Sequence, residues 1–478
     1  MRHKIIYNNF APLAADNATV SAEEPSTYQC VGELLNEEKR DVLNFASFEG
    51  QGIDLTDSAL SFAENGDNLG FVSSAISGGS RKLSPAVELI IELSGGVYSA
   101  PGITIHFWQH YCADVTVKWL NGSALISEKT FYPSELDFYG ENAVDGFNKV
   151  IIDFEETETA FQFVKLAGID LGRTVEITKF YGNINVYTEI SPDCSDLPAS
   201  TCEFEARTED FAPQEAQELY LYTDGELVGK FSVENAEASG QNRYIFECSN
   251  DVMRIDGAPF PALVQGNYTA EQIAAKIKEA SNISVDTGEF SENEVSGFIE
   301  SGKKARLALA MLSFALGCFV TSNGKSLKLQ KPRNCRNKII GANKIFGEAK
   351  YKPSAPFSAL SMTTYSGSFD TVKSEFKYSN PTKRANSSVG EKEYKKYSLI
   401  GNAENRFEEI KEAGFSQNEV TATIILTDEK VGDILSIETP FNGVVTGIIK
   451  SMDITLSTAK TAEITLIERG YAANGGEA

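Results

Sequence analysis

The chain has only three histidines in 478 residues, which leaves few side chains for acid–base or metal chemistry. His106 and His110 are the one closely spaced pair. The run Ile103-Thr104-Ile105 just before them is β-branched and predicts a strand. On a strand, four residues span roughly 13 Å, which is too far for two imidazoles to bind one zinc ion at about 2 Å. We therefore predict that this pair binds no metal.

One acidic stretch has the side chains that bind calcium, namely Glu64-Asn65-Gly66-Asp67-Asn68. It lacks the Asp-X-Asp-X-Asp-Gly spacing of an EF-hand, so a solvated turn is the favoured interpretation. The motifs of common enzyme classes are also missing: the sequence has no P-loop, no Gly-X-Ser-X-Gly, no His-Glu-X-X-His and no Cys-X-X-Cys. Its many carboxylates favour solubility. We predict that the protein is not an enzyme and has no catalytic residue, cofactor or metal.

Aromatic residues are the other candidates for a binding site. Trp108, Tyr111, Tyr132 and Tyr139 fall in a segment of β-forming residues. Such rings often fill a core, but rings that share one exposed face can stack on sugars. Both interpretations stay open, and these four residues are our candidate glycan-facing aromatics.

Gly447 is a candidate of a different kind, because it has no side chain that could do chemistry. It interrupts the strand-like run Val444-Val445-Thr446-Gly447-Ile448-Ile449. Glycine weakens a strand interior, so its presence there suggests a bulge, a bend or a close backbone approach. We predict a bend that helps a small barrel to close.

The elements that would position such residues are clearest between Glu218 and Gln330. Asp224-Gly225 between alternating apolar residues predicts a hairpin. Thr269 with Gln272 predicts a helix that begins with a capping box. A second helix is predicted over Lys303–Leu316 and should end at Gly317. It is apolar almost all round, which indicates burial within the protein, and its apolar run is too short to span a membrane.

The remainder is dominated by β patterns. Short strands at sandwich-like spacing run from about residue 43 to 187, with a hairpin turn at Asn121-Gly122. The segment 369–397 is charged and weakly patterned, which predicts a long loop. A short helix is predicted over 402–413, and strong β runs follow it to about residue 470.

Composition bounds the class of protein. The length predicts three or four domains, and seven scattered cysteines indicate folding in a reducing cytoplasm and no disulfide framework. No signal-peptide pattern is seen. The net charge is −24. Residues 1–331 hold 24 Lys and Arg against 49 Asp and Glu, whereas residues 332–478 hold 19 against 18. This acidity disfavours nucleic-acid binding.

Several segments carry a resemblance to a known family: GELVGKFSVENAE, NRYIFECSNDVMRIDGAPFP, YTAEQIAAKI, KKARLALAMLSFALGCFVTSNGKSLKLQKP and VGDILSIETPFNGVVTGIIKSMDITL. They resemble baseplate hub, or tail-hub, proteins of bacteriophage tails and phage-derived contractile particles. FASFEGQGIDL, GFVSSAIS, YSAPGITIHF and FVKLAGIDLG resemble a β-sandwich module inside hub proteins of Firmicutes phages, a jelly roll of the carbohydrate-binding kind.

The resemblance implies a mainly β fold with an α+β part. It predicts a discontinuous first hub barrel from residues 1–42 and 188–260, with the jelly-roll-like sandwich inserted at 43–187. An α/β connecting domain would cover 261–331, and a second hub barrel would cover 332–478.

The function implied is structural. The protein would be a homotrimeric hub that joins a sixfold tail tube to a threefold central spike. Its partners would be its own copies, the tube or distal tail protein and the spike, with tape-measure and other baseplate proteins as further candidates. It would be made in the bacterial cytoplasm and assembled into a virion tail or phage-like particle. Two alternatives are a hub with cell-wall hydrolase activity and a glycan-binding tail protein.

Overall fold

A computed structural model describes residues 2–22, 28–29, 31–35, 48–49, 52–53, 70–208, 211–322, 326–353, 357–379, 391–414, 418–440 and 442–468. The chain divides into two units. We call Tyr7–Glu176 with Pro213–Glu218 the sandwich unit, and Met1–Ile6, Ile177–Ala212 and Leu219–Ala478 the larger unit. The fold is mainly β with helices in the larger unit, as predicted. No helix in the described part of the chain is long and apolar enough to cross a membrane.

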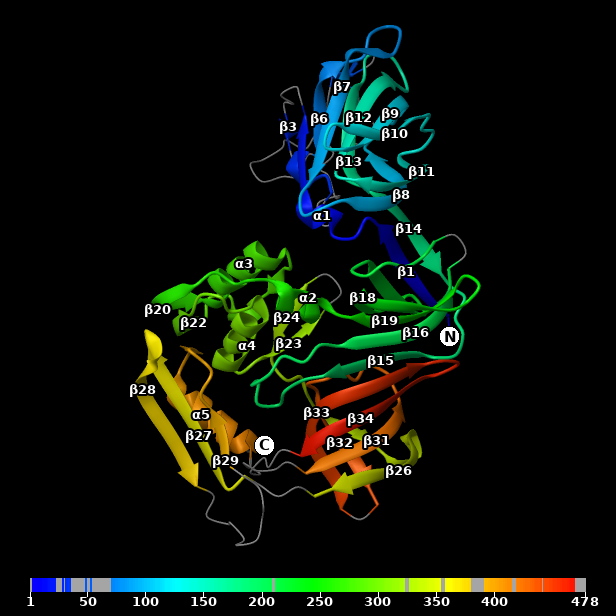
Figure 1. Ribbon diagram of the computed structural model, residues 1–478. Helices are drawn as coiled ribbons and strands as arrows, with labels where there is room; N and C mark the ends of the chain where they lie inside the picture. Colours follow the sequence, from blue (N-terminus) through cyan, green and yellow to red (C-terminus); the bar gives the residue numbers. More distant parts are fainter. Residues whose placement is uncertain are drawn as a thin grey trace. The chain divides into compact units, whose positions relative to one another are not determined.

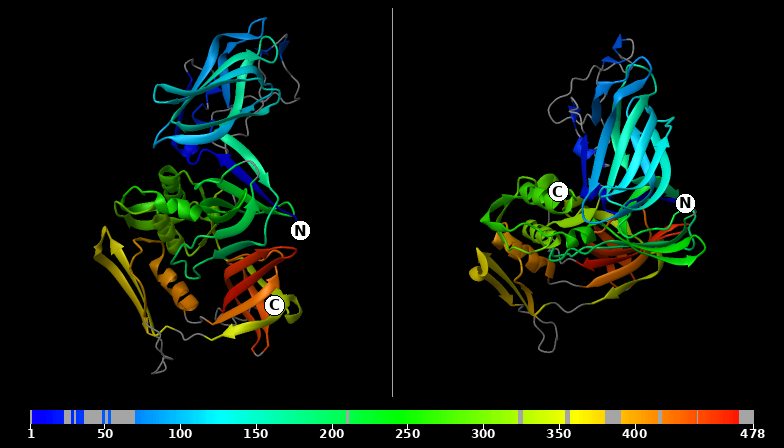
Figure 2. Two further views of the ribbon diagram at one scale, coloured as in Figure 1. Left: turned by 45° about the vertical axis from the view of Figure 1, so that its right-hand side comes forward. Right: turned by 45° about the horizontal axis from the view of Figure 1, so that its top comes forward.

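The sandwich unit is built from two five-stranded sheets, which Figures 1 and 2 show as two layers. One sheet has the order β10 (Ala124–Phe131), β9 (Cys112–Asn121), β12 (Lys149–Thr157), β7 (Lys82–Leu93) and β2 (Ala18–Ala22). The other has the order β11 (Asp137–Phe147), β8 (Tyr98–Phe107), β13 (Phe163–Asp170), β6 (Phe71–Ile76) and β3 (Tyr28–Gln29).

The core of the sandwich unit contains large side chains such as Trp119, Phe147 and Phe154, all with no exposed surface. The predicted hairpin at Asn121-Gly122 joins β9 to β10. The unit begins earlier than residue 43 because β2 and β3 complete its two sheets. Smaller elements are α1 (Ala14–Asn17), η1 (Val31–Glu33), β4 (Phe48–Glu49) and β5 (Gly52–Ile53). That the sandwich is an insertion into a hub domain remains a prediction.

The larger unit contains one extended sheet. Its strands lie in the order β17 (Glu218–Thr223), β18 (Glu226–Gly240), β19 (Arg243–Ser249), β16 (Thr201–Arg207), β15 (Ile184–Glu189), β33 (Gly443–Leu456), β34 (Lys460–Glu468), β31 (Glu419–Ile425) and β26 (Ile345–Lys352). β32 (Ile434–Thr439) pairs with β33 and with β25 (Asn334–Ile340). Two further strands are β1 (His3–Phe10), which begins in this unit, and β14 (Gly172–Ile177).

The two predicted barrels are not closed: none of the described sheets forms a ring. At one end the outermost strands β26 and β25 do not pair with each other, so the sheet stays open there. β33 joins the two predicted barrels, because one of its edges is shared by two partners. Residues 443–448 pair with β32, and residues 451–456 pair with β15. A register shift between Ile449 and Ser451 against β34 lies where the partner changes. One long strand thus connects what the sequence suggested were two separate barrels.

The α/β part follows its local signals closely. Thr269 caps α3 (Ala270–Ser281) in a full capping box with Gln272, as predicted. Gly317 ends α4 (Ala305–Leu316) with a φ of 62°, a left-handed conformation that glycine adopts readily. These helices, with α2 (Asp251–Gly257), pack beside two small sheets: β20 (Leu263–Thr269), β22 (Glu294–Ile299) and β30 (Leu399–Ile400), and β21 (Val285–Asp286), β24 (Leu327–Gln330) and β23 (Phe319–Ser322). The short η3 (Gly288–Phe290) lies between β21 and β22.

The prediction of a long loop over 369–397 is wrong for the part that the structure describes, and residues 380–390 lie outside the described residues. This region contains β28 (Ser368–Ser379), which pairs with β27 (Ala359–Ser366), and β29 (Glu391–Tyr394). Phe376 and Tyr378 pack against the core of the larger unit, while the charged residues between and around them are exposed or half-buried. Apolar and polar residues therefore alternate in this segment, as in a strand with one buried face. The many charged residues made this alternation hard to recognise in the sequence. The predicted helix appears as α5 (Ala403–Gly414).

Candidate functional site

The connection between β15 and β16 is a loop of the larger unit that several hydrogen bonds hold in place. Side chains that are distant in sequence donate hydrogen bonds to it. Tyr397 Oη binds Ser195 O, and Arg306 binds Leu197 O through Nε at 3.2 Å and Nη2 at 2.7 Å. We call residues 191–197 the junction loop, because the side chains that bind it come from α4, α5 and the β29–β30 region.

At the centre of the junction loop lies the carboxylate of Asp193, which is 7% exposed. It accepts hydrogen bonds from Lys392 Nζ, from Tyr394 Oη at 2.6 Å and from Ser191 Oγ at 2.6 Å. Burial by itself would raise the pKa of Asp193, but the Lys392 charge and these hydrogen bonds outweigh it and hold the pKa well below its usual value. The carboxylate is therefore ionised and firmly paired.

Arg406 extends the network from α5. Its Nη2 donates to Asp193 O, and its Nη1 donates to Glu409 Oε2 at 2.8 Å. The guanidinium also lies 5.0 Å from the centre of the Phe314 ring, which stacks on Tyr397 with centroids 3.8 Å apart. A buried arginine is thus paired through both hydrogen bonds and an aromatic face.

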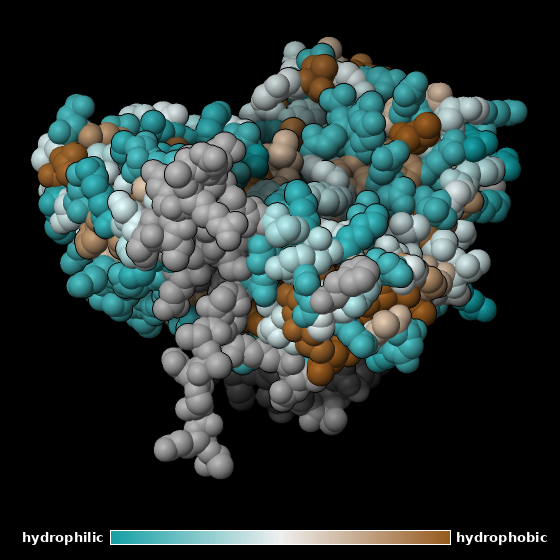
Figure 3. All heavy atoms as spheres, turned by 90° about the horizontal axis from the view of Figure 1, so that it is seen from below, coloured by the Kyte–Doolittle hydropathy of each residue, from teal (hydrophilic) through white to brown (hydrophobic). Residues whose placement is uncertain are grey.

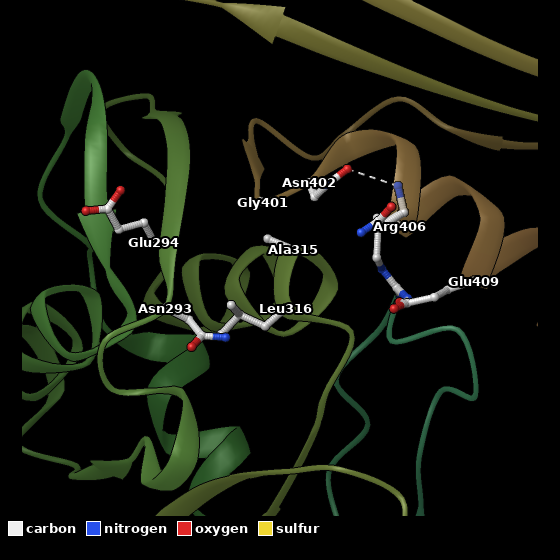
Figure 4. Close-up of a pocket in the computed structure, with 9 residues that line it drawn as sticks. Asn293, Glu294, Ala315, Leu316, Gly401, Asn402, Arg406 and Glu409 are labelled. Atoms are coloured by element: carbon white, nitrogen blue, oxygen red, sulfur yellow. Dashed lines mark hydrogen bonds and ion pairs between the residues drawn. The ribbon is translucent and has the colours of Figure 1, made fainter.

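A pocket of about 250 Å³ lies beside Arg406 (Figure 4). β22, the end of α4 and the start of α5 line it. Figure 4 shows Arg406 extending toward Glu409, so its charge is already paired there. The lining residues are Asn293, Glu294, Ala315, Leu316, Gly401, Asn402, Asn405, Arg406 and Glu409.

The chemistry of the junction favours rigidity over catalysis. Burial and the neighbouring Asp193 carboxylate raise the pKa of Tyr394, and burial followed by Asp193 raises the pKa of Tyr397. Both phenols thus stay protonated and donate hydrogen bonds. General acid–base catalysis needs a group with a pKa near the working pH, whereas Asp193, Tyr394 and Tyr397 are all shifted away from neutrality. This network is suited to hold three parts of the chain together.

Removing one hydrogen bond from this network should have a moderate effect. We expect Tyr394→Phe to lower the free energy of unfolding by about 2 kcal/mol, because hydrogen bonds to charged buried groups contribute roughly 1.5–3 kcal/mol. Urea unfolding followed by circular dichroism would measure the change, since both tryptophans (Trp108 and Trp119) lie in the sandwich unit and would not report on the larger unit. Tyr365→Phe is a suitable control, since its hydroxyl donates to Lys395 O at a more exposed site. Equal losses in the two variants would contradict a special role for Tyr394.

Gly447 lies where β33 and β34 approach closely. A Cβ atom added to it would overlap the carbonyl oxygen of Ile467 and would lie 2.8 Å from the carbonyl carbon of that residue. Its φ is not in the left-handed region, so its need for glycine is steric and not conformational. That this glycine also provides a barrel bend remains a prediction.

The four candidate glycan-facing aromatics have different surroundings. Trp108, just after β8, is buried, and Lys165 Nζ lies 5.3 Å from the centre of its ring. Tyr139 in β11 donates to Pro101 O at 3.0 Å, and Arg173 lies 5.2 Å from its ring centre. Tyr111 is half-buried before β9, and Tyr132 is 71% exposed after β10. Trp108 and Tyr139 adjoin the sheet that contains β8 and β11, whereas Tyr111 and Tyr132 adjoin the other sheet, next to the paired strands β9 and β10. A sugar platform shared by all four stays a prediction.

The two histidines have separate partners. His106 contacts Asp137 at 2.6 Å through Nδ1 and Asp170 at 2.9 Å through Nε2. His110 Nε2 lies 2.8 Å from Phe163 O. Among the described residues, no group of three or more His, Cys, Asp or Glu side chains is arranged to hold a metal ion. The acidic stretch 64–68 lies outside the described residues.

Sequence reasoning missed the junction network. Asp193 and Lys392 are 199 residues apart, and Asp193 and Arg406 are 213 apart. No motif links them, and single charged residues are normally read as solvated. The weak signal available was the pair Tyr394 and Tyr397, two aromatic residues in an otherwise charged segment.

Comparison with known proteins gives structural neighbours only. No family model and no curated protein matches the sequence. The prophage tail protein gp18 from Listeria monocytogenes EGD-e is similar with 15% identity and a TM-score of 0.45, over 63% of this chain and 92% of its own. A tail protein from Neisseria meningitidis MC58 shares 12% identity (TM-score 0.45, 62% and 94% coverage). The 43 kDa tail protein of prophage MuSo2 from Shewanella oneidensis shares 11% identity with a TM-score of 0.45, over 62% of this chain and 95% of its own. These solved structures are tail proteins, the class of protein that the sequence segments resemble.

Proposed function

We propose that this protein is a structural hub of a phage tail tip or phage-like baseplate. In this role it forms a homotrimer and joins a sixfold tail tube to a threefold central spike. The observation that carries the proposal is the position of the hub-like segments. They form β18, β19, α3, α4, β32 and β33 of the larger unit. In that unit β33 connects the strands from β17 to β15 with β34, β31 and β26, so that all of them belong to one sheet. A hub that transmits force between a tube and a spike needs such a continuous scaffold.

The junction network supports a mechanical role. The junction loop is held by residues of three other segments through charge-assisted hydrogen bonds, which are stronger than neutral ones. These bonds hold the junction loop, and with it β15 and β16, against α4, α5 and β29. The partners in this proposal are further copies of the chain, the tube or distal tail protein and the spike, with tape-measure and other baseplate proteins as additional neighbours.

The negative net charge of the protein suits a hub along which DNA passes without binding. The sandwich unit holds 28 Asp and Glu against 9 Lys and Arg, a net charge of −19, out of −24 for the whole chain. An acidic surface repels phosphates, so DNA would not bind to it. In the proposed hub, this repulsion keeps nucleic acid from adhering to the protein as it leaves the tail.

The proposal predicts self-assembly of the purified full-length chain. We expect a species of three times the 52.1 kDa chain mass, or a species that reaches this mass when the spike protein is added. Light scattering coupled to size-exclusion chromatography, over a hundredfold range of concentration, is the measurement. A chain that remains monomeric under all these conditions would contradict the hub function.

A further inference from the structure

Two buried cysteines of the larger unit lie directly opposite each other on neighbouring strands. β16 and β19 are antiparallel neighbours (Figure 1), and their register is unbroken along the whole of β16. In this register Cys202 is the partner of Cys248. Both are free thiols, and the two residues are 1% and 3% exposed. Directly opposite residues point to the same side of a sheet, so the two thiols share its buried face.

The spacing of opposite residues in such a ladder suits a disulfide. The Cα atoms of an opposite antiparallel pair are about 4.5 or 5.5 Å apart, depending on the hydrogen-bonding pattern. A disulfide joins residues whose Cα atoms are about 4.4–6.8 Å apart. The next opposite pair on the same face is Phe204 and Phe246, whose rings stack with their centroids 4.5 Å apart. Side chains at these positions therefore meet across the two strands.

Cys112 provides a comparison within the same chain. It is also 1% exposed and also lies on a strand, β9, but the residue opposite it in β12 is Thr157. Its partner in the ladder thus offers no second thiol. Cys112 has the burial of Cys202 and Cys248 without their pairing.

Burial keeps the paired thiols unreactive while the ladder is closed. Burial raises the pKa of Cys202, and burial followed by the nearby Cys202 raises the pKa of Cys248. The thiolate is the form that attacks a disulfide, so exchange requires β16 and β19 to open locally. Reagents in water first meet the surface, which is mostly hydrophilic on the face that Figure 3 shows. The same burial protects a disulfide, once formed, from reductants.

We propose that Cys202 and Cys248 form a cross-strand disulfide when the protein meets a small-molecule disulfide such as oxidised glutathione. One protein thiolate attacks a sulfur atom of oxidised glutathione and releases one glutathione thiolate. The second protein thiolate attacks the protein sulfur of this mixed disulfide and releases the other glutathione. The two protein thiols lose two protons and two electrons in total, and oxidised glutathione becomes two molecules of glutathione.

The disulfide joins β16, which follows the junction loop, to β19, which leads into α2. It closes the segment that contains β17 and β18, and a crosslink of this kind stabilises a fold mainly by restricting the unfolded chain. A reducing cytoplasm keeps the pair reduced, whereas a particle released from the cell meets an oxidising environment. This timing rests on the proposed function, but the chemistry of the pair does not.

The test is refolding of the full-length protein from urea in a mixture of oxidised and reduced glutathione. After alkylation of the remaining thiols, we expect peptide mapping by mass spectrometry to link Cys202 to Cys248 and to show Cys112 alkylated. The oxidised protein should have an equilibrium constant of unfolding about tenfold lower, or more, than the reduced protein. Folded protein kept in the same mixture should acquire the same link slowly, and faster in urea too dilute to unfold it, because local opening limits the reaction.

Cys248→Ala is the informative variant, and Cys112→Ala is its matched control, since each removes one buried thiol from a strand. The control should keep the disulfide and the added stability, and Cys248→Ala should lose both. Each variant is compared with itself in oxidising and reducing buffer, which removes the cost of the cavity that alanine leaves.

Three results would overturn the inference. They are alkylation of both Cys202 and Cys248 after refolding, a link between Cys194 and Cys318 in place of the expected one, and an oxidised protein that unfolds as readily as the reduced one. The oligomeric state separates this inference from the proposed function. A chain that forms the disulfide but stays monomeric supports the inference and contradicts the hub function, whereas a chain that assembles without the disulfide overturns the inference alone.

Discussion

Asp193→Asn should lower the free energy of unfolding of the larger unit by about 3 kcal/mol, because breaking a buried ion pair leaves an uncompensated charge. The amide cannot replace the charge that Lys392 faces, and its NH₂ group cannot accept the hydrogen bond from Tyr394 or Ser191. Urea unfolding at neutral pH measures the loss. Asp196→Asn is the matched control, since Asp196 lies in the same loop, is exposed, and keeps an oxygen to accept from the Leu197 amide.

Acidification should shrink the difference between wild type and Asp193→Asn. The folded-state pKa of Asp193 is lowered, so its stabilising contribution is complete above the unfolded-state pKa of about 4 and is lost as pH falls further. The variant has no such titrating group. Unfolding midpoints of both proteins between pH 3 and pH 7 should therefore differ by a constant amount above about pH 5 and begin to approach each other below it. A difference that stays constant across this range would mean that the loss in Asp193→Asn is not electrostatic.

Gly447→Val should be similarly damaging, with an expected loss of about 3 kcal/mol. Its Cβ would overlap the Ile467 carbonyl group, and backbone atoms cannot move aside as a flexible side chain can. Overpacking of this kind costs roughly 1–3 kcal/mol and occasionally more. Because the overlap begins at Cβ, Gly447→Ala should lose most of the same stability. Thermal unfolding of the two variants measures both effects.

The control for Gly447 is Gly257→Ala at the end of α2. A Cβ there would meet no atom within 4 Å. Alanine restricts the unfolded chain and should leave stability unchanged or slightly higher. In the proposed hub, displacement of β34 by Gly447→Val should also weaken assembly, which light scattering detects. A valine variant as stable as the wild type would show that β33 and β34 separate easily and that Gly447 has no steric role.

Local signals in the sequence determined much of the secondary structure. The Thr269 capping box, the Asp224-Gly225 turn between β17 and β18 and the Gly317 helix end are all present in the structure. Each depends on residues within a few positions of one another, so backbone geometry and nearby hydrogen bonds are sufficient to specify it. The class of fold followed from the same signals, because alternating apolar residues predict strands wherever one face is buried.

The tertiary structure decided how these elements combine. Nothing local to β33 indicates that its edge is divided between β32 and β15, which makes one continuous sheet of what the sequence suggested were two separate barrels. The Asp193 network joins residues that are 199 and 213 positions apart, and ion pairs over such separations leave no periodic pattern. The exposure of Phe346 and Ile425 is likewise invisible in an apolar β pattern, because the pattern shows that residues share a face but not whether that face is covered.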